Sequence, residues 1–313
     1  MEQLVEQVVA GAVAAPTQAT AAVLAALQNR QLDVLGLVAL LKRPLTDDMD
    51  HEGRAKAVQL LSTAACDAPE VLLAGDVGVI ADFLAAKLKD WRCVAAAAPG
   101  CLALLRRCRQ PGLAQLPQQA AVGLVQQFVG IHVQGLDFKG RSACYLLLLE
   151  VLQGPHGVPC ALAGIDLASF TALSMENESD PRCLLHSLKC VQAVGALYQQ
   201  PALARVSHFD SSLEDLFDIG ICPYFPMMFK PPKDNPAGIT REQLLAHVID
   251  AMGCCPQFAA LGVPLLSEKM GSALNQAKAD ALLALPACCK AWGAAAVRPH
   301  LQAVSAAAAA MRA

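Results

Sequence analysis

Apolar residues recur at helical spacing along most of the chain. Two clear stripes are formed by Leu184, Leu185, Leu188, Val191, Val194 and Leu197, and by Leu244, Leu245, Val248, Ile249 and Met252. Spacings of three and four residues place these side chains on one face of a helix, which is the face that a protein buries. Alternation of apolar and polar residues does not persist anywhere. The pattern therefore predicts an all-α protein.

The helical stretches follow a recurring order, in which a polar turn leads to a basic residue and then to an apolar helix. The basic residues are Arg54, Arg92, Arg141, Arg182, Arg241 and Lys278, at steps of 38, 49, 41, 59 and 37 residues. Most steps lie near the roughly 40 to 47 residues of HEAT and armadillo units. At Asp180 and Pro181 the carboxylate is expected to cap free N–H groups, while proline takes the first helical position. Each such turn should begin the second helix of a pair.

The first helices of the pairs are expected around residues 80–88, 213–217 and 258–266, with Pro264 as a bend in the third. One helix pair cannot bury two apolar stripes by itself, so adjacent pairs should stack. The sequence thus predicts a right-handed α-solenoid of HEAT or armadillo type, continuous over residues 1–313, with about six to seven helix pairs. Residues 297–311 resemble the first helix of a further pair, which indicates a portion of a longer array.

The longest step contains an insertion at residues 222–238, with five prolines among Tyr224, Phe225 and Phe229. Long ordered insertions in compact arrays are uncommon and often functional. The candidate partner-binding residues are Tyr224, Phe225, Phe229, Lys230, Lys233, Asp234 and Arg241. In this hypothesis the two phenylalanines are anchors, and the lysines and Asp234 form a polar rim. The alternative, in which the aromatic rings pack over neighbouring repeats, remains open.

Charge and composition argue against several classes of protein: nucleic-acid-binding, membrane-spanning and secreted. Hydrophobic residues make up 55% of the chain, which is ample for a core, and charged residues only 16%, with a net charge of −3. No basic field is present to hold a phosphate backbone, so direct binding of nucleic acid is not expected. The longest uncharged stretch, residues 110–136, contains two prolines and several glutamines, which argues against a membrane span. Glu2 and Glu6 replace the positive charge of a secretory peptide, so we expect the cytoplasm, the nucleus or both.

Thirteen cysteines suggest metal chemistry, but their spacing does not support it. No Cys-x-x-Cys pair occurs, and no cysteine and histidine cluster has zinc spacing. Most of the cysteines lie inside apolar helical runs. We therefore expect reduced, buried thiols that act as small apolar side chains, and neither a metal nor a cofactor.

One motif resembles a phosphate-binding loop. Gly135, Gly140 and Ser142 have the required spacing, but Arg141 stands where a lysine must reach the phosphates, and no strand pattern precedes the loop. An ordinary turn between helices is the favoured interpretation, with a nucleotide-dependent enzyme as the less favoured one. The motifs of hydrolases and metalloproteases are missing, so the sequence does not indicate an enzyme.

The insertion also carries a family resemblance. The run Tyr224-Phe225-Pro226, followed by Phe229, Pro231-Pro232, Asp234, Pro236, Gly238-Ile239 and Arg241-Glu242, is similar to the N-terminal domain of one adaptor family. This family is the methyl-methanesulfonate-sensitivity adaptor of DNA repair and transcription, the HEAT-repeat member of the cytosolic iron-sulfur assembly targeting complex. Further matches are Arg54-Ala55, Gln59-Leu60-Leu61-Ser62, Asp180-Pro181-Arg182 and Cys288-Cys289.

The resemblance implies a non-catalytic adaptor. Its partners would be apo iron-sulfur enzymes of DNA metabolism and the other subunits of the targeting complex, and the adaptor would carry no cluster itself. Members of the family are about three times longer than this chain, and their C-terminal repeats dock the other subunits. Because one fold hosts many functions, a nuclear-transport receptor or phosphatase scaffold with the same repeats is the alternative.

Overall fold

The described part of the chain is helical and contains no strand, as the sequence predicts. The computed structural model describes residues 1–10, 16–47, 49–206, 208–232, 234–302 and 305. These residues form two compact units, Met1–Ala163 and Gly164–Ala313.

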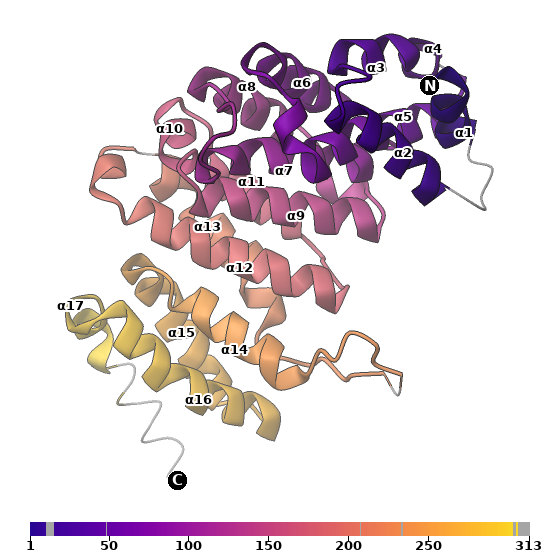
Figure 1. Ribbon diagram of the computed structural model, residues 1–313. Coiled ribbons are helices and arrows are strands. Elements are labelled where there is room, and N and C mark those ends of the chain that lie inside the picture. The colour runs from indigo at the N-terminus through magenta and orange to yellow at the C-terminus, as the bar shows by residue number, and fades with distance from the viewer. Residues whose placement is uncertain (11–15, 48, 207, 233, 303–304, 306–313) are drawn as a thin grey trace. The chain divides into compact units, whose positions relative to one another are not determined.

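The first unit contains ten α-helices in its described residues. They are α1 (Glu2–Ala10), α2 (Pro16–Gln28), α3 (Val34–Leu40), α4 (Lys42–Thr46), α5 (His51–Asp67), α6 (Ala74–Lys87), α7 (Val94–Arg106), α8 (Gln118–Phe128), α9 (Phe138–Gln153) and α10 (Gly157–Leu162). Helix α7 packs between α5 and α9, and α6 packs on both α7 and α8 (Figure 1). Six helices of this unit thus form two rows, α5–α7–α9 and α6–α8–α10.

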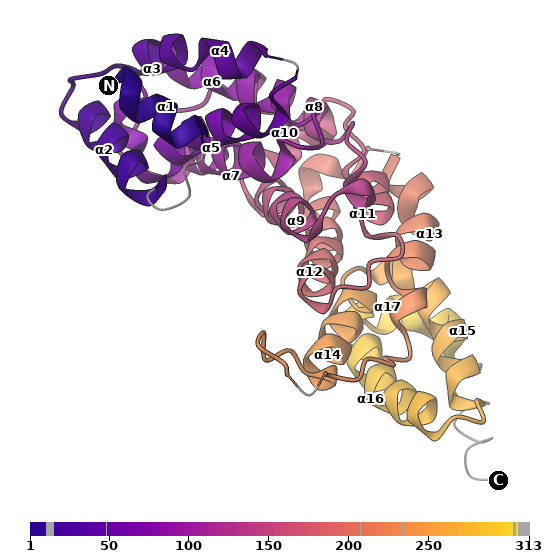
Figure 2. The same ribbon diagram turned by 90° about the vertical axis from the view of Figure 1, so that its right-hand side faces the viewer.

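The second unit repeats this arrangement. Its described α-helices are α11 (Leu167–Met175), α12 (Pro181–Tyr198), α13 (His208–Gly220), α14 (Arg241–Met252), α15 (Ala259–Met270), α16 (Asn275–Trp292) and α17 (Ala294–Val297). Helix α14 packs between α12 and α16, while α11 packs on α13 and α15 packs on α16 (Figure 2). The row α12–α14–α16 holds the second helices of the pairs that the sequence predicts.

Capping residues explain where several of these helices begin. The Asp180 carboxylate accepts a hydrogen bond from the N–H of Arg182, with Pro181 at the first helical position, as predicted. Thr240 and Gln243 form a capping box at the start of α14. The Asp137 carboxylate caps α9, which begins at Phe138, earlier than the apolar run alone indicates.

Close approach of helices within the first unit depends on a glycine. A Cβ atom on Gly100 of α7 would lie 2.6 Å from Ser62 Oγ and 2.7 Å from Leu84 Cδ1. The Ser62 hydroxyl donates a 2.5 Å hydrogen bond to the Ala96 carbonyl across the same α5–α7 contact. A larger residue at position 100 would therefore force α5, α6 and α7 apart.

Arg107 is a charged residue in the core of the first unit and is 1% exposed. Its guanidinium donates to the carbonyl oxygens of Ala114, Pro69 and Leu72 at 2.6, 2.8 and 3.2 Å. Burial lowers the pKa of Arg107. Because three carbonyls satisfy the side chain, it ties the turns after α5 and α7 together.

Two further expectations concern the chain's ends and membranes. The helix predicted at residues 297–311 falls mostly outside the described residues; α17 ends at Val297 and the 3-10 turn η7 (Arg298–His300) follows.

No single described helix has both the length and the apolar character to cross a bilayer. Only two pairs, each bent by 100° or more, meet those criteria when their helices are combined.

Candidate functional site

The candidate site is the 222–238 segment, which connects α13 to α14 in the second unit. It opens with the 3-10 turn η5 (Cys222–Tyr224), and residues 225–232 and 234–240 have no regular structure. Figure 2 shows its middle part projecting from the start of α14. The segment divides into a half that is fixed to the helices and a half that is exposed.

The first half is anchored in the core of the second unit. Phe225 and Met227 are each 3% exposed, and the Phe225–Pro226 peptide bond is cis. The Tyr224 hydroxyl donates a 2.7 Å hydrogen bond to the Met175 carbonyl at the end of α11. Burial raises the pKa of Tyr224 to about 12. The rings of Tyr224 and Phe225 thus attach the segment to its own unit.

A buried carboxylate holds the backbone at the centre of this half. Asp280 of α16 is 1% exposed and accepts a hydrogen bond from the Met227 N–H at 3.0 Å. The same carboxylate accepts from Arg241 Nη2 at 2.7 Å and from Gln276 Nε2 at 3.0 Å. Arg241 Nε in turn donates to the Met227 carbonyl at 2.8 Å. These bonds fix the segment, the start of α14 and α16 to one another.

An apolar hollow of about 200 Å³ opens beside this anchored half. It is lined by Glu178, Ser179, Pro181, Leu184, Pro223, Tyr224, Pro226, Met227, Met228, Phe229 and Leu244. Met228 is 61% exposed and Phe229 is half-buried, whereas Leu184 and Leu244 are buried. The hollow therefore combines an apolar floor with exposed apolar side chains at its edge, as in pockets that receive one side chain of a partner.

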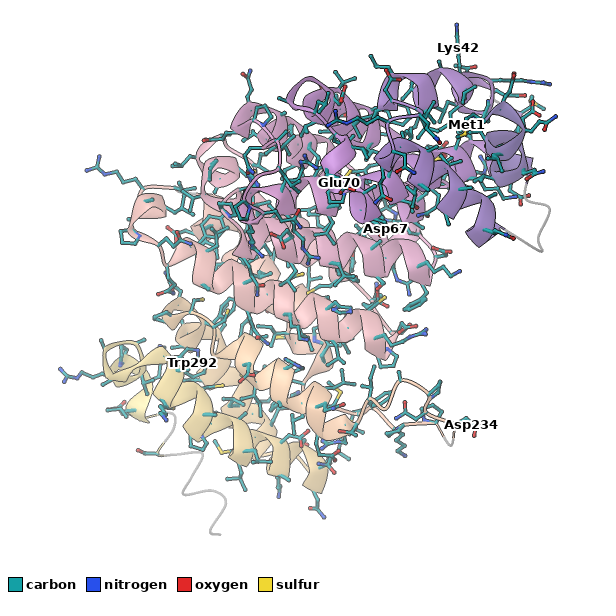
Figure 3. The ribbon with its side chains drawn as sticks, in the orientation of Figure 1. Met1, Lys42, Asp67, Glu70, Asp234 and Trp292 are labelled. Carbon is teal, nitrogen blue, oxygen red and sulfur yellow. The ribbon has the colours of Figure 1, made fainter. Side chains whose placement is uncertain are left out.

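The second half of the segment is exposed. Lys230 and Asp234 both face solvent, and Figure 3 shows Asp234 at the far end of the segment from α14 and α16. The turn that returns the chain to α14 is closed by a 2.8 Å hydrogen bond from Asn235 Nδ2 to the Ile239 carbonyl. Gly238 has φ +62°, a conformation that favours glycine.

The structure corrects two roles expected from the sequence. Phe225 is buried, so it cannot be an exposed anchor. Successive side chains of an extended segment point to opposite sides, and the side chain of Phe225 points toward the core. Arg241 is engaged by Asp280 and Met227, so it supports the segment from inside. Phe229, Lys230 and Asp234 remain accessible, and Lys233 lies outside the described residues.

Sequence reasoning missed three residues of this region. Met228 is the most exposed large apolar side chain that the structure describes in the segment, and it directly follows the buried Met227. Glu178 is 3% exposed, lines the hollow and accepts a hydrogen bond from the Asp180 N–H at 3.0 Å. Asp280 lies within a helical stripe, where no local pattern indicates its role.

The glycine motif at residues 135–142 is the start of a helix in the structure. Gly135 ends the 3-10 turn η3 (Val133–Gly135), and the Gly140 N–H donates to the Asp137 carboxylate at 2.8 Å. A phosphate loop needs such N–H groups for its ligand, so this geometry favours the turn between helices. Over the described residues, no three His, Cys, Asp or Glu side chains cluster in a way that could hold a metal ion.

Comparisons with known proteins place the chain in a family. The MMS19_N family model, described as Dos2-interacting transcription regulator of RNA-Pol-II, matches residues 38–309. The chain belongs to the MMS19 family. The candidate site lies inside the matched region, and the resemblance that the 222–238 segment carries is thereby confirmed.

Curated MMS19 relatives come from plants, animals and an amoeba. The protein named MMS19 nucleotide excision repair protein homolog of Arabidopsis thaliana is 31% identical over 282 residues, which cover 89% of this chain and 24% of the relative. The Homo sapiens homologue of the same name is 31% identical over 241 residues, 77% of this chain and 22% of the relative. The chain thus spans about a quarter of the length of the curated MMS19 proteins that it matches.

Proposed function

We propose that this chain is part of a non-catalytic adaptor that helps to direct cytosolic iron-sulfur cluster delivery to apo-proteins of DNA replication, repair and transcription. The observation that carries the proposal is the MMS19 family match over residues 38–309. The relatives are named as nucleotide excision repair proteins, and the family model as a transcription regulator. The partners proposed are the other subunits of the targeting complex and apo iron-sulfur clients, in the cytoplasm and the nucleus.

We further propose that the helix pairs form a HEAT-like α-solenoid. Support comes from the packing inside each unit: α5–α7–α9 and α6–α8–α10 form two rows in the first unit, and α12–α14–α16 form a row in the second. Such arrays offer long surfaces of side chains, which suits a protein that binds several different partners.

The hollow beside the 222–238 segment is the proposed contact for one class of partner. Its floor is held by the buried Asp280 and Arg241 pair, so a partner would meet a surface that is already ordered. Met228 and Phe229 supply adaptable apolar contact, a feature of surfaces that accept different partners. Lys230 lies next to them and is exposed.

Affinity purification from cells that produce the full-length gene product, followed by mass spectrometry, tests this proposal. Tagged wild type is compared with the double variant Met228→Ala/Phe229→Ala and with Leu283→Ala, which alters a side chain on α16 of nearly the same exposure as Met228, 62% against 61%. We expect wild type and Leu283→Ala to recover iron-sulfur proteins and assembly factors, and the double variant to lose a subset of them. Recovery of no such protein by wild type would refute the adaptor function, whereas equal recovery by all three would refute only the role of the hollow.

A further inference from the structure

Trp91 is a large aromatic residue that the first unit leaves in solvent. It lies in the turn between α6 and α7 and is 63% exposed. The Arg92 guanidinium lies 4.5 Å from the centre of its ring. The chain's other tryptophan, Trp292, is 3% exposed and donates from Nε1 to the Met252 carbonyl at 2.9 Å. Packing therefore accounts for Trp292 but not for Trp91.

The backbone that carries Trp91 is rigidly held. The Asp90 carboxylate accepts a hydrogen bond from Arg54 Nε at 2.9 Å, which ties the turn to α5. It also accepts one from the Arg92 N–H at 3.2 Å, across Trp91 in the chain. The Cys93 N–H donates to the Asp90 carbonyl at 2.7 Å and closes the turn. An aromatic ring on an ordered turn loses little conformational entropy on binding.

Trp91 forms a common wall of two hollows in the first unit. One, of about 280 Å³, is lined by the polar side chains of Lys89 and His132 and by four aliphatic side chains, those of Leu88, Val94, Ile131 and Leu136. The other, of about 380 Å³, is lined by His51, Glu52, Ala55, Trp91, Arg92, Ala95 and Asp137. A chain that crosses Trp91 can therefore place neighbouring side chains on either side of the indole.

The available charge at this surface is positive. Lys89 lines the first hollow and Arg92 the second, and no carboxylate among residues that the structure places forms an ion pair with either one. The three acidic residues nearby are already engaged. Asp90 accepts hydrogen bonds from Arg54 Nε and from the Arg92 N–H, and the other two line the second hollow. Glu52 pairs with Lys56 at 2.6 Å, and Asp137 caps α9 through the Gly140 N–H.

We infer that Trp91, with Lys89 and Arg92, forms a docking surface for an extended, acidic peptide segment of a partner protein. The peptide would place a large apolar side chain in the hollow above Leu88, Ile131 and Leu136, against the face of Trp91. Its neighbouring carboxylates would meet Lys89 and Arg92. Tryptophan and arginine are the residues that most often dominate the binding energy of protein interfaces. Carboxylates pair well with an arginine that is already stacked on an aromatic ring.

Single-stranded nucleic acid is the competing ligand, since its bases stack on exposed aromatic rings. It fits less well, because binding of a phosphate backbone depends on many cations, and of the lysines and arginines only Lys89 and Arg92 line the two hollows. The aliphatic side chains of Leu88, Val94, Ile131 and Leu136 in the first hollow suit an apolar side chain of a peptide, whose few neighbouring carboxylates need no more than two cations.

Fluorescence anisotropy with a labelled peptide tests the surface on the whole 313-residue chain. The probe alternates Asp and Glu with Phe and Leu; the control probes replace its acids by lysine or its apolar residues by serine, and a fourth probe is labelled oligothymidine. We expect saturable binding of the acidic apolar peptide, weakened by roughly tenfold or more in Trp91→Ala and in Lys89→Glu/Arg92→Glu. The matched controls, Leu283→Ala and Lys290→Glu, alter exposed residues of α16 and should bind as wild type does.

A second readout uses the two tryptophans of the chain. Acrylamide should quench Trp91 and leave Trp292 largely unquenched, and the bound peptide should protect Trp91. The inference is overturned if the acidic peptide does not bind, binds no better than the lysine or serine probes, or binds equally to Trp91→Ala. If oligothymidine binds more tightly than the peptide, and if this binding is lost in Trp91→Ala, the surface is a nucleic-acid site instead. Circular dichroism of each variant separates loss of binding from loss of folding.

Discussion

Arg241 at the start of α14 and Asp280 in α16 form an ion pair in which the carboxylate is more deeply buried than the guanidinium. The side chain of Asp280 is 1% exposed and that of Arg241 is 19% exposed. Both residues also bond to the backbone of Met227, one to its N–H and the other to its carbonyl. The pair thus fixes the backbone of the 222–238 segment at Met227, although neither residue lines the hollow that is proposed to bind a partner.

Arg241→Ala should destabilise the second unit by about 3 to 5 kcal/mol, because it leaves the carboxylate of Asp280 buried without its cation. Denaturant unfolding followed by circular dichroism measures this loss. Arg182→Ala is the matched control, since Arg182 pairs with Asp180 at 2.7 Å but is about half exposed. The control should lose much less stability. Equal losses in the two variants would show that the buried pair does not fix the segment.

Phe225→Ala and Phe229→Ala should have unequal effects. Phe225 is 3% exposed, so its removal should cost about 3 to 5 kcal/mol of the free energy of unfolding, as for other buried aromatic residues. Phe229 is half-buried at the edge of the hollow, and its removal should cost clearly less. Thermal unfolding of the two variants gives the comparison. A smaller loss for Phe225→Ala than for Phe229→Ala would contradict the orientation of the segment.

The helical elements were predictable because their signals are local. Asp180 and Pro181, or Thr240 three residues before Gln243, lie within one turn of the helix that they begin. The apolar stripes of α12 and α14 likewise repeat within each helix. At α9 the capping residue Asp137 also lies directly before the helix, although the continuous apolar run begins only after Arg141.

The candidate site was predictable only in its location. Proline content and aromatic residues single out the 222–238 segment, but they do not tell which rings are buried. That choice depends on Asp280, which lies 39 residues after Arg241 in the sequence and holds the backbone at Met227. A contact between such distant residues leaves no spacing pattern, so Phe225 and Met228 could not be assigned to opposite sides beforehand.

The cysteines should separate by accessibility in a thiol titration. Cys66 and Cys108 are exposed, whereas Cys101, Cys160 and Cys190 are buried and burial raises the pKa of all three thiols. Because the thiolate is the reactive form, a thiol reagent should label the two exposed residues of the native chain before the buried ones, although burial of its sulfur also raises the pKa of Cys66. All thirteen cysteines should react once the chain is unfolded in denaturant. Mass mapping of the native sample checks the assignment, and early labelling of Cys101 or Cys190 would contradict the packing of α7 or α12.

Two histidines should make the stability of the second unit depend on pH below about pH 6.5. His186 and Lys189 lie on α12, and His247 on α14. Burial, and then the positive charge of Lys189, lowers the pKa of both histidines below the ordinary 6.5. The backbone carbonyl of His247 accepts from Gln192 Nε2 at 3.2 Å, which joins the two helices at this point.

The sign of the effect follows from proton binding. Below about pH 6.5 the unfolded chain takes up protons on these histidines that the folded chain resists, so the free energy of unfolding falls as pH decreases. The contribution is complete above the unfolded pKa and is lost as pH falls through the lowered folded pKa. Lys189→Met removes the repulsive charge, so it should raise both histidine pKa values and flatten the pH dependence. Histidine ring signals in NMR and urea unfolding between about pH 7.5 and pH 5 measure the two effects. Lys290→Met, on the exposed face of α16, serves as the control; a pH dependence that is the same in both variants would mean that Lys189 does not act on His186 and His247.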